Sequence, residues 1–439
     1  MSSPLITLTP KKAGIDAAGG TLDVLLRVQS PPMPEKTERR ERPPIHLALV
    51  LDRSSSMSGA PIIEAKKCAQ KIVERLGVRD KAAIVSFSDS VHTLSSLVPV
   101  APAGRLLSAI EGIEASGNTN LHGGWLQGAQ ELAAQSEGGA LSRVVLLSDG
   151  QANEGIVDPQ AIFAQCRELT AAGISTTTIG LGHSFNEDLM VGMAKAGQGQ
   201  HYYGQSAKDL YDAFLEELEL TEALHSTGLH ATLVPGPGVI VEILSKENVR
   251  ADAPIPLSDL AFGAEAWLLV RLHYSAKPVG SHALLSVSVS GKAVGGATFT
   301  TAPALLELPV LNTTGLALLP ADALVGRRQA EALSARLLLA FRSRLSSGDR
   351  QGAEQALAEL KALGREHAWI GESVAELEEL LRRDEAMARK EALYTSSRLQ
   401  DRLAPVAEEA YRSDETAAPA GMPVFLRRKA VQGRGKTDK

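Results

Sequence analysis

The chain has 439 residues, of which 44% are hydrophobic and 22% are charged. This composition is typical of folded globular proteins and excludes a mostly disordered, collagen-like or coiled-coil chain. The length predicts several domains, because one hydrophobic core rarely serves more than roughly 250–300 residues. The 45 basic and 51 acidic residues give a net charge of −6, which argues against bulk nucleic-acid binding because phosphate neutralisation requires a basic surplus.

Cysteine content and hydropathy bear on the cellular compartment. The two cysteines, Cys68 and Cys166, are too few for a disulfide scaffold or a four-cysteine zinc ribbon. No signal peptide is legible in Met1 to Lys12, and no run reaches the about 18 apolar residues of a membrane-spanning helix. We therefore expect a soluble, cytoplasmic protein with no transmembrane segment, in which both cysteines are small buried hydrophobic residues.

The first predicted element is a β-strand near the N-terminus. Hydrophobic residues alternate from Thr21 to Gln29, which is the period of a half-buried strand. A proline-rich stretch follows, with a charge run from Glu35 to Arg42 that predicts a solvated linker. We assign residues 1–43 to N-terminal strands and this linker.

From Ile45 onward, short apolar runs alternate with amphipathic segments, which predicts a mainly parallel sheet covered by helices on both faces. The segment from His92 to Val98 follows its preceding strand too closely for a helical crossover, so it should be an antiparallel edge strand. Residues 44–222 are thus predicted to form a six-stranded, doubly wound α/β domain. The expected strands are 45–52, 82–88, 92–98, 143–149, 175–182 and 200–204, and the expected helices are 61–76, 105–113, 121–134, 159–172, 187–196 and 207–222.

The rest of the chain predicts a β region followed by helices. Short alternating runs between Gly and Pro turns over residues 223–319 are typical of an antiparallel β-sandwich. Residues 1–30 are too few to fold alone, so they should supply strands to this sandwich, with the α/β domain inserted between them. Residues 320–404 have a helical period that predicts a small hairpin or three-helix unit. Residues 405–439 are expected to form a flexible basic tail suited to an anionic surface or partner.

Three short motifs stand where strands are predicted to end or a helix to begin. One buried strand ends at Asp52, with hydroxyls at Ser54 and Ser56; another runs into Asp149; and a loop before a helix presents Thr119. The carboxyl ends of parallel strands form the binding crevice of an open α/β sheet, so these side chains should converge. Five oxygen donors with two negative charges suit a hard cation such as Mg²⁺, not zinc, and leave one position for water or an external carboxylate.

The order and spacing of these motifs resemble the metal-ion-dependent adhesion site of the von Willebrand factor type A domain. The matching segments are Asp52-x-Ser54-x-Ser56, Gly117-Asn118-Thr119 and Ser148-Asp149-Gly150. The resemblance covers about residues 44–222 and implies that the five residues named above bind Mg²⁺ or Mn²⁺ in preference to Ca²⁺. It also implies that a Glu or Asp of a partner protein completes the coordination. The flanking segments resemble those of inter-α-inhibitor-like proteins, in which strands from both sides of the A domain build a β-sandwich.

Other polar residues near the predicted site have simpler interpretations. His201 is predicted to be a structural histidine in a strand, whereas His122 and His183 are placed in loops within reach of a partner. Arg53 and Ser55 lie between the predicted ligands, where they either contact a partner or are simply solvated.

These features together predict a non-enzymatic cytoplasmic scaffold or adaptor that captures an acidic side chain of a partner, such as an AAA-type ATPase, through the ion. One alternative is a Mg²⁺-dependent hydrolase acting on phosphoryl groups, because a two-carboxylate site can polarise such a substrate. The sequence has no Gly-x-Ser-x-Gly, His-Glu-x-x-His or Walker motif in support of it. In a third hypothesis the ion only braces the loops, and the β and helical regions make the contacts.

Overall fold

The computed structural model describes residues 3–32, 43–134, 139–149, 152–181, 185–204, 221–246, 249–294, 296–400 and 404–405, and the single residues 215 and 218. The chain forms two compact units. The inserted unit comprises residues 38–222 with 294–296, and the flanking unit comprises residues 1–37, 223–293 and 297–439. The inserted unit therefore interrupts the sequence of the flanking unit.

A six-stranded sheet in the order β6-β5-β4-β7-β8-β9 forms the centre of the inserted unit. Its strands pair in parallel except β5 and β6, which are antiparallel because only residues 88–90 connect them. The predicted six-stranded sheet and its antiparallel edge strand are confirmed. The strands are β4 (Ile45–Asp52), β5 (Lys81–Phe87), β6 (Val91–Pro99), β7 (Leu141–Ser148), β8 (Ile174–Leu181) and β9 (Gln198–Gly204).

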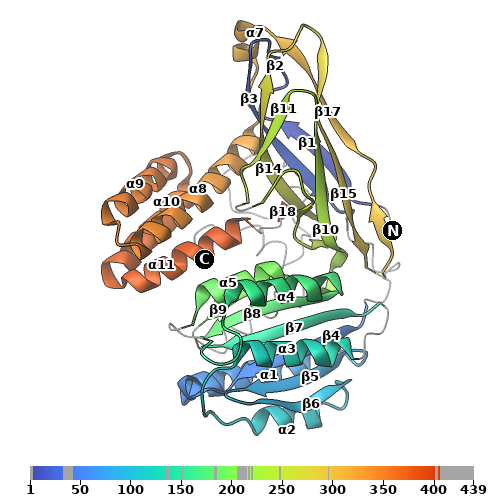
Figure 1. Cartoon of the computed structure of the whole chain (residues 1–439), viewed down its shortest axis with the longest axis vertical. Helices are drawn as coiled ribbons and strands as arrows, with labels where there is room; N and C mark the ends of the chain where they lie inside the picture. Colours follow the sequence, from blue (N-terminus) through green and yellow to red (C-terminus); the bar gives the residue numbers. More distant parts are fainter. Residues whose placement is uncertain are drawn as a thin grey trace. The chain divides into compact units, whose positions relative to one another are not determined.

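Helices cover both faces of this sheet (Figure 1). One face packs against α1 (Ala60–Arg75) and α2 (Gly104–Glu111). The other packs against α3 (Leu121–Ala133), α4 (Pro159–Ala171) and α5 (Glu187–Ala196). These five helices begin and end within two residues of the predicted ranges. The sixth predicted helix, 207–222, lies largely outside the described residues.

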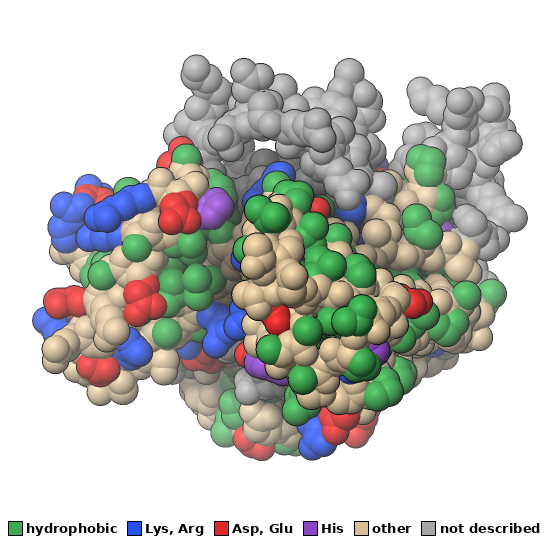
Figure 2. Space-filling view, turned by 90° about the horizontal axis from the view of Figure 1, so that it is seen from above, with side chains coloured by type: hydrophobic (Ala, Val, Ile, Leu, Met, Phe, Trp, Pro, Cys, Tyr) green, Lys and Arg blue, Asp and Glu red, His purple; other side chains and the backbone are tan. Residues whose placement is uncertain are grey.

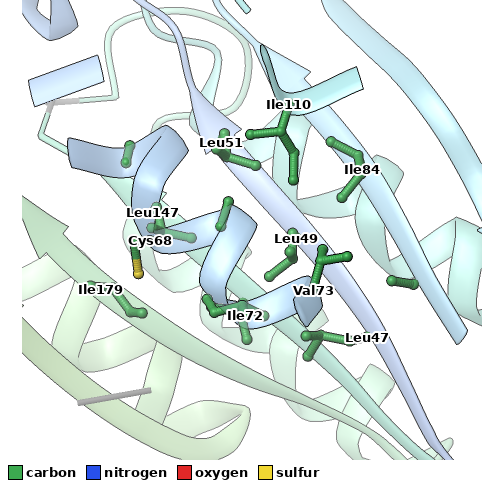
Figure 3. Close-up of a cluster of buried hydrophobic side chains, with 14 of the residues drawn as sticks. Leu47, Leu49, Leu51, Cys68, Ile72, Val73, Ile84, Ile110, Leu147 and Ile179 are labelled. Atoms are coloured by element: carbon green, nitrogen blue, oxygen red, sulfur yellow. The ribbon is translucent and has the colours of Figure 1, made fainter. Parts of the chain in front are cut away.

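The strand β4 contributes side chains to two hydrophobic cores, since successive residues of a strand point to opposite faces. Leu47, Leu49 and Leu51 pack under α1, whereas Ala48 and Val50 pack under α3. Figure 3 shows Cys68 of α1 among these leucines and apolar residues of the neighbouring strands. Both cysteines are free and buried, and burial raises the pKa of each thiol to about 12, so both behave as the small hydrophobic residues predicted from the sequence.

The flanking unit contains two β-sheets. Each of them combines strands that precede the inserted unit in the sequence with strands that follow it. In the first, N-terminal β3 (Gly19–Gln29) pairs along its length with β14 (Ala264–Ser275), and the order is β1-β3-β14-β11, with β18 also pairing with β14. The N-terminal strands, blue in Figure 1, thus lie beside strands from the second half of the chain. The remaining strands of this sheet are β1 (Leu5–Pro10), β11 (Val239–Ile243) and β18 (Ala404–Pro405).

The second sheet has the order β12-β10-β15-β17-β2, with β13 pairing with β10 and β16 with β15. The strand β17 lies within the predicted β region, and its Leu306, Leu308 and Val310 alternate as buried residues. The strands are β2 (Ile15–Asp16), β10 (Leu224–Pro235), β12 (Ile255–Pro256), β13 (Leu260–Ala261), β15 (Ser281–Ala293), β16 (Thr298–Thr300) and β17 (Ala304–Leu311).

Four long helices follow, so the predicted hairpin or three-helix unit was wrong. The fourth was missed because it contributes mainly small residues, such as Ala388 and Ala392, to the bundle core in place of a leucine stripe. Figure 2 shows acidic and basic side chains mixed over the exposed surface of these helices. The elements are a short helix α7 (Thr313–Leu318) and then α8 (Ala323–Ser346), α9 (Arg350–Glu366), α10 (Ala368–Arg383) and α11 (Glu385–Gln400).

Candidate metal centre

The carboxylate of Asp52 is fixed at the carboxyl end of the central strand β4. Its side chain is 0% exposed. One carboxylate oxygen accepts a hydrogen bond from the Ser54 amide at 2.8 Å, and the other accepts one from the Ser148 hydroxyl at the end of the neighbouring strand β7. Because both oxygens are held, the side chain has one orientation at the edge of the sheet.

Two hydroxyls connect this carboxylate region to a second one. The Ser54 and Ser56 hydroxyl oxygens lie 3.0 Å apart, and the Ser56 hydroxyl donates to Asp149 Oδ1 at 2.9 Å. The buried Met57 anchors the short 3₁₀ turn that carries Ser56. Asp52, Ser54 and Asp149 are buried, whereas Ser56 is exposed. Four of the five predicted ligands are therefore joined in one hydrogen-bonded group with an open side at Ser56.

The fifth predicted ligand, Thr119, lies on a loop that hydrogen-bonds to the segment after Asp52. The Ser116 amide donates to the Arg53 carbonyl at 2.6 Å, and the Ser55 amide donates to the Gly117 carbonyl at 2.9 Å. Thr119 is 4% exposed. Within the described part of the chain, no hydrogen bond joins the Thr119 side chain to the other four. The structure thus attaches its loop to the site through backbone contacts.

Both carboxyl groups prefer their neutral form more than ordinary aspartates do. Burial raises the pKa of Asp52, although hydrogen bonds from Ser148 and Ser54 act in the opposite direction. Burial also raises the pKa of Asp149 from 3.8 to about 6; the Ser56 hydrogen bond lowers it, and the charge of Asp52 raises it further. Neither carboxylate pairs with a Lys or Arg among the described residues. The pair therefore lacks a positive counter-charge from the described protein.

The donor set fits a hard divalent cation. Two carboxylates and neighbouring hydroxyls supply only oxygen, which suits Mg²⁺ or Mn²⁺ better than zinc. Nowhere in the described ranges do three or more His, Cys, Asp or Glu side chains gather as a metal site. A site on this protein's described surface would thus depend on hydroxyls in addition to carboxylates, as the five predicted residues do.

None of the histidines that the structure describes belongs to this group. His122 was placed in a loop, but it is the second residue of α3, 6% exposed, with Nε2 2.8 Å from Gln165 Oε1. The loop placement was wrong, because the helix begins at Leu121, as the predicted range 121–134 already implied, and the His122 ring is buried. His201 lies 2.9 Å from the Thr178 hydroxyl, and burial lowers its pKa to about 3, as befits a structural histidine. His183 lies outside the described residues.

The two residues between the predicted ligands differ in their surroundings. The Arg53 guanidinium donates to the Ser116 hydroxyl at 2.8 Å and so braces the loop that carries Thr119. The Ser55 side chain is exposed. Arg53 therefore hydrogen-bonds to the loop that carries Thr119, whereas the Ser55 side chain is open to solvent.

Three supporting residues were not predicted from the sequence. Ser148 holds Asp52, Asn153 pairs with the Thr119 backbone, and the Asp89 carboxylate accepts from the Asn118 amide at 2.8 Å. Ser148 directly precedes Asp149, and Asn153 follows it by four residues. Their closeness in sequence to a predicted ligand was the signal that could have identified them. Asp89 carried no such signal, because its partner is 29 residues away.

Comparison with known proteins supports the fold of the inserted unit. Residues 46–216 match the family model of the von Willebrand factor type A domain. An uncharacterized protein, sll0103, from Synechocystis is 26% identical over 301 residues, covering 65% of this chain and 70% of that protein. Human inter-alpha-trypsin inhibitor heavy chain H4 is 29% identical over 219 residues, covering 47% of this chain but only 23% of the relative.

Two solved structures share the fold over most of the chain. A von Willebrand factor type A protein from Catenulispora acidiphila superposes with a TM-score of 0.70 and 14% identity, covering 91% of this chain and 97% of that one. The ArnB paralog VWA2 from Sulfolobus acidocaldarius gives a TM-score of 0.58 and 18% identity, covering 90% and 98%. At these identities the likeness concerns the fold alone. Among the described helices of this chain, none is both long and apolar enough to cross a membrane.

Proposed function

Because residues 46–216 match the family model of the von Willebrand factor type A domain, a domain that generally serves protein–protein interaction, we propose that this protein is a metal-dependent protein-binding module. In this proposal Asp52, Ser54, Ser56, Thr119 and Asp149 bind Mg²⁺ or Mn²⁺. The bound ion supplies a positive charge that attracts an acidic side chain of a partner. The protein acts as a non-enzymatic scaffold or adaptor.

One observation carries the proposal. Two buried carboxylates, Asp52 and Asp149, are connected through the backbone amide of Ser54 and the hydroxyls of Ser54 and Ser56, and neither has a Lys or Arg partner among the described residues. Burying unpaired carboxylates is costly, so a site of this kind is stabilised by a cation. If these residues served folding alone, hydrophobic residues or an internal ion pair in their place would cost less free energy.

The exposure of the group favours partner capture over a closed structural site. Asp52 and Ser54 are buried, but Ser56 faces solvent and Ser55 beside it is exposed. Neutral hydroxyls give the ion few anionic ligands from this chain, so an external carboxylate gains a strong interaction there. A Glu or Asp presented by another protein is such a ligand.

The proposed setting is the cytoplasm, where a scaffold or adaptor would act on an assembly such as one built on an AAA-type ATPase. The support is that both cysteines are free and buried and form no disulfide with each other. Disulfides are rare in reducing compartments. The predicted basic tail, which lies beyond the described residues, would supply a second contact with an anionic surface or partner.

The first test combines metal binding with partner capture. We expect the full chain to bind Mg²⁺ and Mn²⁺ in isothermal titration calorimetry, and the double variant Asp52→Ala with Ser54→Ala to lose that binding. Partners captured from the native lysate should be released by a chelator. Asp158→Ala is the matched control, because Asp158 caps α4 with two backbone hydrogen bonds and leaves the candidate site intact. If the double variant kept the full affinity of the wild type for Mg²⁺ and Mn²⁺, the proposal would be wrong.

The same reagents separate the two alternatives. A hydrolase requires sustained phosphatase or nucleoside-triphosphatase turnover that depends on Mg²⁺ and disappears in Asp149→Ala. If the ion only braces the loops, a chelator should lower the melting temperature and leave the affinity for the partner unchanged. We expect neither result.

A further inference from the structure

The loop that carries Thr119 is fixed by three successive backbone amides. The Asn118 amide donates to Asp89 Oδ1 at 2.8 Å, and the Asn120 amide donates to the Ser88 carbonyl at 2.9 Å. Both of these acceptors belong to the turn between β5 and β6. The central amide, that of Thr119, donates instead to Asn153 Oδ1 at 2.9 Å.

Asn153 makes a second bond to the same residue. Its own backbone amide donates to the Thr119 carbonyl at 3.2 Å, so both backbone polar groups of Thr119 are satisfied by one asparagine. Asn153 lies in the connection between β7 and α4, four residues after Asp149. Asn153 therefore holds the Thr119 loop to the connection that begins after Asp149.

A close approach between the same two loops supports the link. Gly155 has a φ of +71°, and a Cβ atom placed there would lie 2.5 Å from Asn120 Oδ1. A larger residue would be strained by the positive φ and would displace the Asn120 side chain. The segment after Asn153 therefore lies close to the residue that follows Thr119.

We infer that Asn153 is a positioning residue that sets the distance between Thr119 and Asp149 and thereby makes the site selective for Mg²⁺ over Ca²⁺. The physical reason is the difference in ion size. Mg²⁺ needs nearly ideal octahedral geometry at about 2.0–2.1 Å, whereas Ca²⁺ accepts six to eight oxygens at about 2.3–2.6 Å in flexible arrangements. A site whose Thr119 loop is loosened should therefore lose Mg²⁺ affinity more than Ca²⁺ affinity. This inference rests on the proposed metal binding.

The effect should be separable from unfolding. Asn153 is exposed, and its substitution by alanine removes one side-chain hydrogen bond, worth about 0.5–1.5 kcal/mol, without leaving a cavity. The backbone bond from its amide to the Thr119 carbonyl is retained. Asn186 provides the matched control, since its Oδ1 also accepts one backbone amide, that of Leu189 at 3.1 Å, at the start of α5 in the same unit. Both alanine variants should lower the melting temperature of the metal-free protein slightly.

The test measures Mg²⁺ and Ca²⁺ affinities of the full chain by isothermal titration calorimetry. In Asn153→Ala we expect Mg²⁺ affinity to fall about 10–100-fold, as for other residues that orient metal ligands, and the Mg²⁺-to-Ca²⁺ affinity ratio to fall with it. Asn153→Asp keeps an oxygen acceptor for the Thr119 amide, so its ratio should remain that of the wild type. Asn186→Ala should leave the ratio unchanged.

Two outcomes overturn the inference, and they are distinguishable. If the wild type binds both ions and Asn153→Ala keeps the same ratio, Asn153 has no positioning role, and the proposed function survives. If the wild type binds neither ion, the proposed function fails, and this inference fails with it.

Discussion

At the scale of single residues, the candidate site depends on carboxylates whose charge is unfavourable without a cation. Burial raises the pKa of Asp149 to about 6. In the metal-free protein the folded state therefore holds this proton more tightly than the unfolded state does. The resulting stabilisation is present below the ordinary pKa of 3.8 and is lost as the pH rises through about 6.

Metal binding should show the opposite dependence on pH. Only the ionised carboxylate of Asp149 can bind a cation, so protons compete with the ion below about pH 6. We expect Mg²⁺ affinity to be nearly constant above about pH 7 and to fall about tenfold per pH unit below pH 6, since one proton is displaced for each ion bound. Calorimetric titrations across this range measure it, and a flat profile at acidic pH would contradict the prediction.

At the scale of elements, α8 belongs to two cores within the flanking unit. Leu324 and Val325 near its beginning pack against Trp267 of β14, whereas Phe341 and Leu345 near its end pack in the helical bundle. The side chain of Arg328 lies between these parts with its guanidinium 4.7 Å from the centre of the Trp267 ring. The helix thus packs against the sheet that contains β3 and β14 as well as within the helical bundle.

Charged side chains are buried at this junction. Arg328 is 3.6 Å from Glu265 and 2.8 Å from Glu331, and Arg27 is 2.7 Å from Glu265; all four side chains are at most 2% exposed. Burial raises the pKa of Glu265, while the two arginines act to lower it. The carboxylate of Glu265 therefore depends on both cations to remain ionised in the interior.

Removing one of these cations should be costly. We expect Arg328→Met to destabilise the flanking unit by about 3–5 kcal/mol, because it leaves Glu265 and Glu331 buried without their shared partner. Urea unfolding followed by circular dichroism measures the change. Arg250→Met is the control, since the Arg250–Asp252 pair is exposed and such pairs contribute about 0–1 kcal/mol. If both variants lost a similar free energy of unfolding, burial of the charged group around Arg328 would not determine its contribution to stability.

At the scale of the whole molecule, every residue of the candidate site lies in the inserted unit. Its sheet has hydrophobic cores on both faces, formed by its own helices. The hydrogen bonds that connect Asp52, Asp149 and the Thr119 loop are also internal to this unit. The flanking unit is therefore not needed to build the site.

A fragment containing residues 38–222 should then fold and bind Mg²⁺ with the affinity of the full chain. Calorimetry on the fragment and on the full chain tests this, with the Asp52→Ala and Ser54→Ala fragment as the non-binding control. A folded fragment that binds much more weakly than the full chain would show that the flanking unit contributes to the ion site.

The sequence alone determined the α/β order, the antiparallel edge strand and the candidate ligands, because strand alternation, helical period and motif spacing are local signals. It also predicted that N-terminal residues join the β region, since they are too few to fold alone. The tertiary structure decided what depends on contacts between distant segments. Examples are the pairing of Asn153 with Thr119, the support of Asn118 by Asp89, and the burial of Arg328 beside Glu265. No local pattern encodes these contacts, because each partner is chosen by how the strands and helices pack.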